Sequence, residues 1–467
     1  MSNLDQIQLT RSPIDDSVYV ERELASPSHL ETVVMLAKQA ETSWQQIPLS
    51  QRQAMCHKMV DAFVQKKQEI AEQLCWMMGR PIRFAHLEVD GMAERARYMI
   101  DAAPDALKSI HLPAKANFTR FIQRVPLGTV FVMAPWNYPY LTAVNTVIPA
   151  IVAGNTVILK HSAQTPLCAE QFAYAFEQAG FSRGVFQYLH LSHEAAQSLI
   201  ADSRINQVTF TGSVNGGRQV EAACAGQFKP TALELGGKDP AYVRADADLT
   251  HAVATCVDGA FFNSGQSCCG IERIYVAESL FDDFVEQATA LIAEYQLGRP
   301  DDPNTTLGPM VSASAADFVR GQIEDAVKTG AICHLNPKDF AMDCAGTPYM
   351  APQLLTKVDH SMRLMTEESF GPVVGVMKVH DDEEAIHLMN DSDFGLTAAV
   401  FTKDIDAAIE IGEQLQTGTF FVNRCDYLDP ALAWVGVKHS GKGCSLSQLG
   451  YQQLTRPKSF HIKTGEL

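Results

Sequence analysis

Two adjacent cysteines stand in the stretch NSGQSCCG, residues 263–270, among glycines and hydroxyl-bearing residues. A free cysteine is most often a small buried hydrophobe, so its type alone does not indicate chemistry. Here Gly265 and Gly270 let the backbone turn and approach a ligand closely, and no bulky neighbour in the sequence would bury the sulfur. We therefore interpret this stretch as a candidate site for a nucleophilic thiolate.

A second unusual stretch, LELGGKDP at residues 233–240, places Glu234 between apolar residues and a pair of glycines. Burying a carboxylate at the end of an apolar strand costs free energy, so packing is a poor explanation for this residue. The same position suits a general base, whose strength increases when burial raises its pKa. Together the two stretches favour a catalytic site over a packing role.

These stretches, with PWNYP at residues 135–139 before them, resemble the aldehyde dehydrogenase superfamily in order and spacing, and the likeness extends over nearly the whole chain. The resemblance implies an oxidoreductase that converts a small-molecule aldehyde to the carboxylic acid, with NAD or NADP as hydride acceptor. A thiolate makes this possible because it turns the aldehyde into a tetrahedral thiohemiacetal, a better hydride donor. A hypothesis of another class is a non-catalytic binding or structural relative on the same fold. It is disfavoured because Cys268, Glu234 and Asn137 are all retained.

The resemblance also implies a role for each of these residues. Cys268, two positions after Gln266, matches the family's nucleophile, and Cys269 is expected to be a bystander. Asn137 would donate its side-chain amide to the developing oxyanion, beside the backbone N–H of Cys268. Glu234 would activate the water that hydrolyses the thioester. Family members that pass the acyl group to coenzyme A lack a glutamate here, so we expect a free acid as product.

Cofactor-binding residues are expected at the ends of strands. No G-x-G-x-x-G follows a strand candidate, but QVTFTGSVNGGR at 207–218 leads a strand through Gly212 and Ser213 into a helix. Backbone N–H groups at such a helix start can bind a pyrophosphate. The resemblance implies that Lys160 holds the adenosine ribose, and that Glu368 and Phe370 hold the nicotinamide ribose. The complete set of expected cofactor-binding residues is Trp136, Lys160, Gly212, Ser213, Glu368 and Phe370.

Several positions depart from the family pattern. The glutamate that is common three residues after the ribose lysine is Ala163 here, and His161, a possible partial positive charge, follows the lysine directly. Since a carboxylate near the ribose would repel the 2′-phosphate of NADP, its loss predicts that NAD works and that NADP is accepted too. The lysine and glutamate that have been linked to proton relay or ion binding in the family are Thr146 and Ser445, which puts that relay in doubt.

The aldehyde tunnel is expected to be lined by Tyr140, Asn145, Leu428 and Trp434. Tyr140 and Trp434 favour a medium-sized apolar or aromatic aldehyde. Arg424 would instead anchor a carboxylate if it points inward, as succinate semialdehyde needs. Both substrate classes stay open from the sequence.

Composition bounds the partners and the compartment. The 467 residues carry a formal net charge of −17, which disfavours a nucleic-acid partner because phosphate binding needs clustered lysine and arginine. The N-terminus lacks an apolar signal core, and proline and glycine break the most apolar stretch, 147–159, so we expect no membrane association. Eleven cysteines without framework spacing fit a reducing cytoplasm. No metal site is expected, because His190 and His193 have no second ligand pair nearby.

The periodicity of apolar residues predicts a covering layer of helices, then alternating strands and helices. Helical stripes run over 28–45, from Ser50 to about Leu74, and over 84–107. The strand candidates are 130–134, 156–159, 185–189, 207–210, 231–235, 274–277, 331–335, 373–379, 398–402 and 419–422, with a late helix at 404–417. This alternation implies an α/β protein with two doubly wound parallel-sheet domains.

The predicted dinucleotide-binding domain comprises 1–111 and 127–236, and the predicted catalytic domain comprises 237–445. The segments 112–126 and 446–467 are expected to form a small β oligomerisation arm and tail. An ordinary surface hairpin is the alternative for 112–126, which mixes β-formers with basic residues. The resemblance implies an arm that pairs with the tail near 459–463 across a subunit interface, and hence a homodimer or homotetramer.

Overall fold

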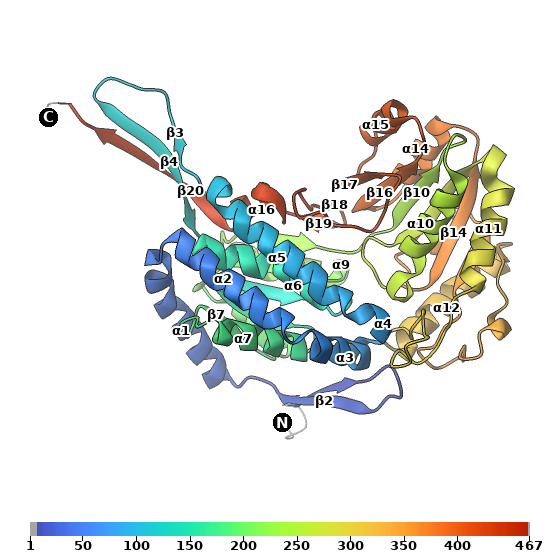
Figure 1. The fold of residues 1–467 in the computed structure, drawn as a ribbon, viewed down its shortest axis with the longest axis horizontal. Helices are drawn as coiled ribbons and strands as arrows, with labels where there is room; N and C mark the ends of the chain where they lie inside the picture. Colours follow the sequence, from blue (N-terminus) through green and yellow to red (C-terminus); the bar gives the residue numbers. More distant parts are fainter. Residues whose placement is uncertain (1–6, 466–467) are drawn as a thin grey trace.

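The computed structural model describes residues 7–465. Two helix-covered sheets lie at opposite ends of the molecule's long axis, and a narrow β arm projects beyond the first of them (Figure 1). The expected α/β class with two doubly wound sheets is confirmed. No helix within the described residues is long and apolar enough to cross a membrane.

The first sheet has strand order β19-β9-β8-β5-β6-β7, and all neighbours are parallel except β19 and β9. Its strands are β5 (Thr129–Ala134), β6 (Thr156–His161), β7 (Phe186–Tyr188), β8 (Ile205–Thr211), β9 (Thr231–Glu234) and β19 (Gly441–Lys442). The central strand β5 is apolar almost throughout, as a strand buried on both faces must be. All five strand candidates before Pro240 are confirmed.

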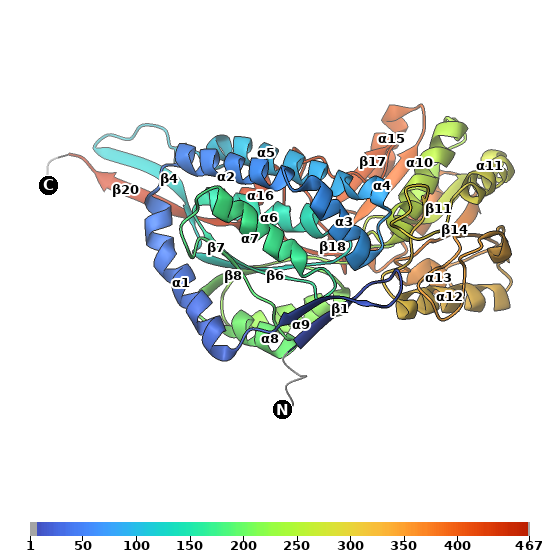
Figure 2. The same ribbon diagram turned by 60° about the horizontal axis from the view of Figure 1, so that its bottom comes forward.

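Each face of this sheet has its own core, because successive side chains of a strand point to opposite faces. Val130 and Val132 of β5 pack under one helical layer, whereas Phe131 and Met133 pack under the other. The first layer contains α2 (Leu49–Val64), α3 (Lys67–Met78), α4 (Ile82–Ala85), α5 (Leu87–Ala106), α6 (Pro139–Ala153) and α7 (Leu167–Gln178). The second contains α1 (Pro27–Gln46), α8 (His193–Ala201) and α9 (Val214–Cys224). Figure 2 shows α8 and α9 on the side opposite α2 and α5.

The predicted helix from Ser50 to Leu74 is wrong as one element. The chain leaves the helical conformation at Lys66, whose φ is −93° and ψ is 10°, and α3 starts anew at Lys67. The buried residues of α2 and α3 therefore enter the same core from two helices with different axes. The period of apolar residues along the sequence does not reveal this change of axis. The first of the two helices, α2, begins after Pro48 without a side-chain cap.

The second sheet has strand order β12-β13-β14-β11-β10-β16-β17, parallel except for β12 against β13. Its strands are β10 (Asp239–Val243), β11 (Ile271–Ala277), β12 (Ile332–Cys333), β13 (Gln353–Thr356), β14 (Val373–Val379), β16 (Thr397–Phe401) and β17 (Thr419–Val422). Its helices are α10 (Leu249–Phe261), α11 (Phe281–Ala293), α12 (Ala313–Lys328), α13 (Arg363–Thr366), α14 (Asp382–Asn390) and α15 (Ile405–Gly412). The strands β10 and β13 were not predicted, because both are short, β10 contains Pro240 and β13 directly follows Pro352.

The helix expected over 404–417 is shorter than predicted. Asp404 caps α15, but the helix ends at Gly412. Gly418 lies beyond the end of the helix, and a Cβ there would collide with the carbonyl of Val435. The absence of a side chain at Gly418 lets the start of β17 approach the backbone of Val435 closely.

The arm predicted for 112–126 is a strand, β4 (Phe118–Pro126), that pairs antiparallel along its whole length with the tail strand β20 (Thr455–Lys463). Phe121 stacks on Phe460 across this pair, with ring centroids 4.5 Å apart. The remaining elements are β1 (Ile7–Arg11), β2 (Val18–Glu23), β3 (Ile110–His111), β15 (Phe394–Gly395), β18 (Val437–Lys438) and α16 (Ser447–Gln453). The arm and the tail therefore pair within one chain, whereas the expectation placed their pairing across a subunit interface.

Candidate active site

A cavity of about 400 Å³ lies where the carboxyl ends of the first sheet's strands face loops of the second sheet. This is the end at which open parallel sheets bind ligands. Its wall combines the ends of β5, β6, β8 and β9 with the loop that carries Cys268 and the loop after α13. The predicted site residues that line it are Trp136, Asn137, Lys160, Gly212, Ser213, Glu234, Cys268, Glu368 and Phe370.

Two glycines bring the motif of Glu234 against the motif of Cys268. A Cβ at Gly237 would collide with the carbonyl oxygen of Cys268, and a Cβ at Gly236 would collide with the carboxylate of Glu368. Glycine at both positions therefore lets the chain after β9 pack against the cysteine loop and the Glu368 loop together.

The two adjacent cysteines have different environments. Cys268 lines the cavity and is half-buried, whereas Cys269 is buried and its Sγ donates to Oδ1 of Asp426 at 2.9 Å. Hydrogen bonding to the neighbouring Cys268 thiol, and then burial, raise the pKa of the Cys269 thiol well above its usual range. Cys269 therefore stays protonated and away from the cavity. Of the two cysteines, Cys268 is the one that lines the cavity.

Asn137 follows β5 and is anchored at both its side chain and its backbone. Its Nδ2 donates to the carbonyl of Gln266 at 3.2 Å, which ties it to the cysteine loop. Its own carbonyl accepts a hydrogen bond from Nη2 of Arg80 at 2.6 Å. The same guanidinium donates from Nε to Oδ1 of Asn263 at 3.2 Å, so one cation holds both sides of the site.

Arg80 pairs with Glu88, and both side chains are almost completely buried. Glu88 also accepts the backbone N–H groups of Tyr140 and Leu141, at 2.9 and 3.0 Å, at the N-terminus of α6. A negative charge is stabilised there by the helix dipole and by the free N–H groups. The pair therefore helps to fix where α6 begins, two residues after Asn137.

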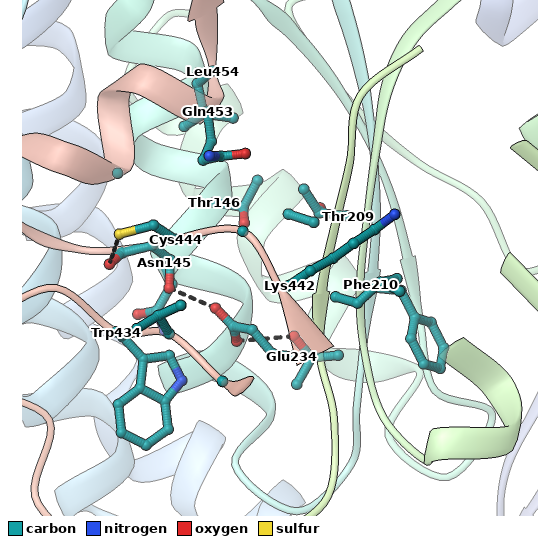
Figure 3. A pocket seen from close by; sticks show the side chains of 18 of the residues that line it. Asn145, Thr146, Thr209, Phe210, Glu234, Trp434, Lys442, Cys444, Gln453 and Leu454 are labelled. Carbon is teal, nitrogen blue, oxygen red and sulfur yellow. Dashed lines mark hydrogen bonds between the residues drawn. The ribbon is translucent and has the colours of Figure 1, made fainter. Parts of the chain in front are cut away.

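Glu234 is the last residue of β9, and two hydroxyl groups hold its carboxylate (Figure 3). Oγ of Ser445 donates to Oε1 at 2.5 Å, and Oγ1 of Thr211 donates to Oε2 at 3.1 Å. Burial raises the pKa of Glu234 above its ordinary value, although the two hydroxyls and the charge of Arg95 act against this shift. A carboxylate with a raised pKa is a stronger general base.

Glu368 and Phe370 lie on a loop that a buried ion pair fixes. Nζ of Lys238 contacts Oε2 of Glu272 at 2.6 Å, and Glu272 accepts the backbone N–H of Phe370 at 2.8 Å. Oε1 of Glu368 accepts the N–H of Gly237 at 3.0 Å. Burial, and then the charge of Glu272, raise the pKa of Glu368 to about 8. The ring of Phe370 meets that of Trp136 edge to face, 5.7 Å away.

The opposite end of the cavity offers groups that fit a dinucleotide. Ser213 caps α9, its Oγ accepting the N–H of Gly216 at 3.1 Å, so the helix start opens toward the cavity. Lys160 is half-buried, and no carboxylate within residues 7–465 lies within ion-pair distance of its ammonium. Burial lowers the pKa of Lys160, and an acceptor such as a ribose hydroxyl or a phosphate oxygen would relieve that cost.

The expectation that His161 adds positive charge beside the ribose is wrong. Its Nδ1 lies 3.0 Å from Oγ1 of Thr165, and its Nε2 lies 3.1 Å from the carbonyl of Pro139. Burial lowers the pKa of His161 to about 3, so the ring is neutral. Since β6 alternates its side chains, His161 points into the protein when Lys160 points into the cavity.

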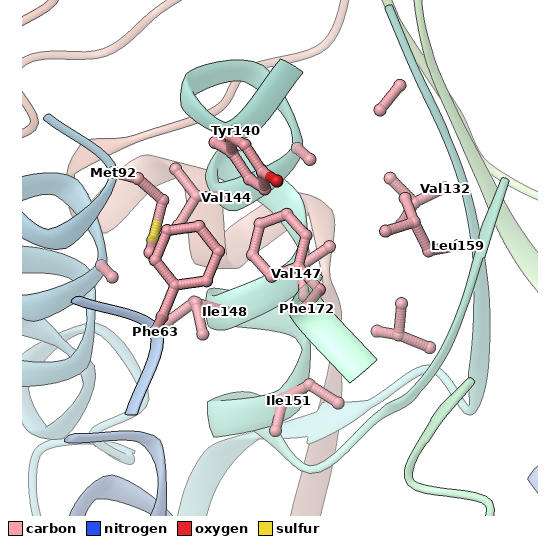
Figure 4. Packing of buried hydrophobic residues seen from close by; sticks show 14 of the residues in the cluster. Phe63, Met92, Val132, Tyr140, Val144, Val147, Ile148, Ile151, Leu159 and Phe172 are labelled. Atoms are coloured by element: carbon pink, nitrogen blue, oxygen red, sulfur yellow. The ribbon is translucent and has the colours of Figure 1, made fainter. Parts of the chain in front are cut away.

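The structure places the expected tunnel residues in different surroundings. Tyr140 is excluded, because it packs in the first core against Phe63 and Phe172 and is fully buried (Figure 4). Asn145 and Trp434 line a small pocket beside Glu234. Trp434 also joins Leu428 and Arg424 in a second pocket of about 130 Å³. The prediction for Tyr140 is wrong because its position on α6 faces α2 and α7.

Arg80, Glu88 and Asp426 were missed from the sequence. None belongs to a motif that the chemistry required, and each acts by holding a neighbour rather than by facing the cavity. The available signal was charge in an apolar surrounding, since Arg80 and Glu88 bracket the short run that contains α4. A buried charge in such a run predicts a buried partner.

The fold and the site together place a cysteine, a carboxylate at the end of a strand and a strand-to-helix turn around one cavity. The chain belongs to the aldehyde dehydrogenase family, whose model matches residues 2–460, and it is an NAD(P)-dependent enzyme that oxidises an aldehyde.

Curated relatives match nearly full length. A succinate semialdehyde dehydrogenase [NAD(P)+] of Escherichia coli K12 is 34% identical, covering 92% of each chain. A succinate-semialdehyde dehydrogenase [NADP(+)] of Mycobacterium tuberculosis is 32% identical, covering 94% of this chain and 96% of its own.

Solved structures agree with this assignment. The succinic semialdehyde dehydrogenase of Streptococcus pyogenes in complex with NADP+ has a TM-score of 0.93 at 29% identity, covering 98% of this chain and all of its own. A betaine aldehyde dehydrogenase of Staphylococcus aureus in complex with NAD+ has a TM-score of 0.92 at 27% identity, covering all of this chain and 93% of its own. Both cofactors therefore occur on this fold.

Proposed function

We propose that Cys268 is the nucleophile of this aldehyde dehydrogenase, with Glu234 as the base and Asn137 as an oxyanion donor. The observation that carries the assignment is that all three line one cavity, which also holds the dinucleotide cradle. Cys269 is excluded from this role by its burial and by its hydrogen bond to Asp426.

The first half of the reaction forms a bond between Sγ of Cys268 and the aldehyde carbon. The carbonyl oxygen becomes an oxyanion, which the side chain of Asn137 and the backbone N–H of Cys268 stabilise. Asn137 is held in place for this by Gln266 and Arg80. NAD or NADP, when held in the cavity, would supply the hydride acceptor, and Cys268 would keep the acyl group as a thioester.

The second half needs a water, and Glu234 takes its proton as the water attacks the thioester carbon. Collapse of the tetrahedral adduct breaks the carbon–sulfur bond and returns the thiolate of Cys268 with a carboxylic acid. The hydroxyls of Thr211 and Ser445 keep the carboxylate oriented for this step.

Six residues are proposed to hold the cofactor. Lys160 would bind the adenosine ribose, and Gly212 and Ser213 would bind the pyrophosphate at the start of α9. Glu368 would bind the nicotinamide ribose, with Phe370 and Trp136 packing beside it. The support is that each lines the cavity from the element that the sequence predicts.

The substrate is proposed to be a medium-sized apolar or aromatic aldehyde. The second pocket, which contains Arg424, is mainly apolar because its lining includes Trp434, Leu428, Phe421, Leu432 and Leu446. A second candidate is an aldehyde with a carboxylate, such as succinate semialdehyde. It is favoured by Arg424, which lines the same pocket with its guanidinium 3.6 Å from the centre of the Tyr427 ring, and by the names of the relatives.

Steady-state kinetics with matched variants tests these proposals. Cys268→Ser should abolish aldehyde oxidation, whereas Cys269→Ser should retain most of it. The reverse result would refute the assignment of the nucleophile. For the substrate, benzaldehyde and succinate semialdehyde are compared with wild type and with Arg424→Met. A high kcat/KM for succinate semialdehyde that collapses in Arg424→Met would establish the second candidate.

The assembly and the domain division are proposed from the same reasoning. We infer that the arm 112–126 and the tail 446–467 mediate a homodimer or homotetramer. We also infer that residues 1–111 and 127–236 form the cofactor domain and that residues 237–445 form the catalytic domain. The protein is proposed to act in the cytoplasm. Exposed apolar residues on β3 and β20, Ile110 and Ile462, support an interface at the arm. Deleting 457–467 should weaken association in sedimentation velocity, and a wild type that is monomeric at micromolar concentration would refute the interface.

A further inference from the structure

The residues on either side of Cys268 donate to one oxygen of the same carboxylate. Oγ of Ser267 and Sγ of Cys269 lie 3.1 and 2.9 Å from Oδ1 of Asp426, and both donors are almost fully buried. The backbone also turns here, because the N–H of Gly270 donates to the carbonyl of Ser267 at 3.2 Å. Cys268 is the second residue of this turn. The turn therefore presents Cys268 to the cavity while both of its neighbours are bound to Asp426.

Asp426 itself has an uncommon backbone conformation. Its φ is 46°, which lies in the left-handed region. Aspartate tolerates this region better than bulkier residues do, yet such conformations persist only where the surrounding contacts determine them. The hydrogen bonds from Ser267 and Cys269 are contacts of this kind.

The loop after β17, which carries Asp426, is fastened to the second sheet and its helices. Asn423 exchanges two hydrogen bonds with the backbone of Thr402, accepting its N–H at 2.9 Å and donating to its carbonyl at 2.8 Å. Sγ of Cys425 donates to the carbonyl of Thr255 on α10 at 3.3 Å. The loop therefore has a fixed path, from which the carboxylate of Asp426 reaches the turn of the cysteines.

The neighbours of Asp426 face the second pocket. Arg424, Tyr427 and Leu428 line this pocket of about 130 Å³, which is proposed to hold the rest of the aldehyde. Leu428 and Cys268 also pack against the same apolar core. One short loop therefore contacts both the proposed substrate pocket and the two residues beside the nucleophile.

We propose that Asp426 is a positioning residue that holds the turn of Cys268 and ties it to the loop lining the second pocket. The inference rests on the proposed role of Cys268 as the nucleophile. Attack needs Sγ of Cys268 aligned with the aldehyde carbon, and the oxyanion needs the backbone N–H of the same residue. The turn sets both directions. Asp426 lines neither the cavity nor the second pocket, so it acts through Ser267 and Cys269.

The charge of Asp426 makes this hold dependent on pH. Burial raises the pKa of Asp426 to about 6, although the hydrogen bonds from Cys269 and Ser267 act against this shift. Above this value the carboxylate is charged and is the stronger acceptor, so the hold on the turn should weaken as pH decreases through about 6. The other charged or titratable groups near the carboxylate are Asp258 on α10, Arg95 on α5, Tyr138 before α6 and Cys425 on the same loop.

The test is the rate of the NADH burst after the enzyme is mixed with NAD and an aldehyde, because the burst reports attack and hydride transfer. Asp426→Leu removes the acceptor, whereas Asp426→Asn keeps Oδ1 as a neutral acceptor. Ser267→Ala combined with Cys269→Ala removes the two donors from the other side. Asp382→Leu is the matched control, because Oδ1 of Asp382 also accepts two hydrogen bonds, at 2.8 and 3.0 Å, but lies on α14 of the second sheet. Binding of NAD, followed by quenching of tryptophan fluorescence, reports separately on the cavity.

We expect Asp426→Leu to slow the burst roughly 100-fold, because a small misplacement of the nucleophile is enough for such a loss. Asp426→Asn should stay within about 5-fold of wild type near pH 7.5 and should lack the additional loss of rate that wild type shows below about pH 6. The variant without the two donors should also be slow, and adding Asp426→Leu to it should cause no further loss, because the three side chains act as one unit. NAD affinity should be unchanged throughout, and Asp382→Leu should keep the wild-type burst.

A wild-type burst in Asp426→Leu, additive losses in the combined variant, or a loss of NAD affinity equal to the loss of burst would overturn the proposal. If Asp426→Leu does not fold, wild type and Asp426→Asn are compared over pH, and identical profiles would overturn it as well. If Cys268→Ser retains the burst, the nucleophile itself is wrong. If Cys268→Ser has no burst while Asp426→Leu is normal, only the role of Asp426 fails.

Discussion

Replacing Arg80 by methionine tests whether a buried cation organises the active site. The substitution keeps most of the side-chain volume but leaves the carboxylate of Glu88 buried without its partner. Removing one member of a buried pair costs about 3–5 kcal/mol. It also removes the hydrogen bonds to the carbonyl of Asn137 and to Oδ1 of Asn263, at 2.6 and 3.2 Å. We therefore expect lower stability together with a lower kcat.

A chain of this size is expected to unfold irreversibly, so the assay is the rate of thermal inactivation. If most of the lost free energy lowers the unfolding barrier, inactivation should be roughly 100-fold faster or more. Arg97→Met is the matched control, because its pair with Asp61 is exposed and worth at most about 1 kcal/mol. Equal inactivation of Arg80→Met and Arg97→Met would refute the reasoning.

Three further predictions concern the chemistry. Asn137→Ala should lower kcat about 100- to 1000-fold by removing an oxyanion donor, and a loss below 10-fold in steady-state assays would contradict that role. Because burial raises the pKa of Glu234, thioester hydrolysis should fall as pH decreases through a value above the ordinary carboxyl pKa; a rate independent of pH down to the ordinary value would argue against this base. Wild type should accept NADP with a kcat/KM within about two orders of magnitude of that for NAD, and Ala163→Glu should lower the NADP value a further 10-fold or so through like-charge repulsion. Parallel kinetics with both cofactors decides this, and a wild type that rejects NADP more than about 1000-fold would contradict it.

The residues proposed for catalysis could be selected from the sequence because the chemistry restricts their types. Packing explains neither a cysteine among glycines nor a glutamate at the end of an apolar strand, where burying the carboxylate costs free energy. Both residues line the cavity. The central strands were equally clear, since a strand buried on both faces must be apolar along its length. The turn from β8 into α9 was also predicted, because Gly212 and Ser213 directly follow a strand candidate in the sequence.

Side-chain direction was the part that sequence did not determine. Tyr140 lies three residues after Asn137, yet the rotation of α6 turns it into the core. His161 adjoins Lys160, yet strand alternation turns it the opposite way. A prediction of these directions requires the register of the element against its neighbours, which arises from tertiary packing. The break at Lys66 escaped prediction for the same reason, because both halves keep a helical period.

The most direct test of the central claim is to find the acyl group. Glu234→Gln is mixed with an aldehyde and NAD, quenched in acid after the NADH burst, digested and mapped by mass spectrometry. The proposed mechanism predicts a stoichiometric thioester on Cys268 and none on Cys269. An acyl group on Cys269, or a burst of NADH without any cysteine adduct, would contradict it.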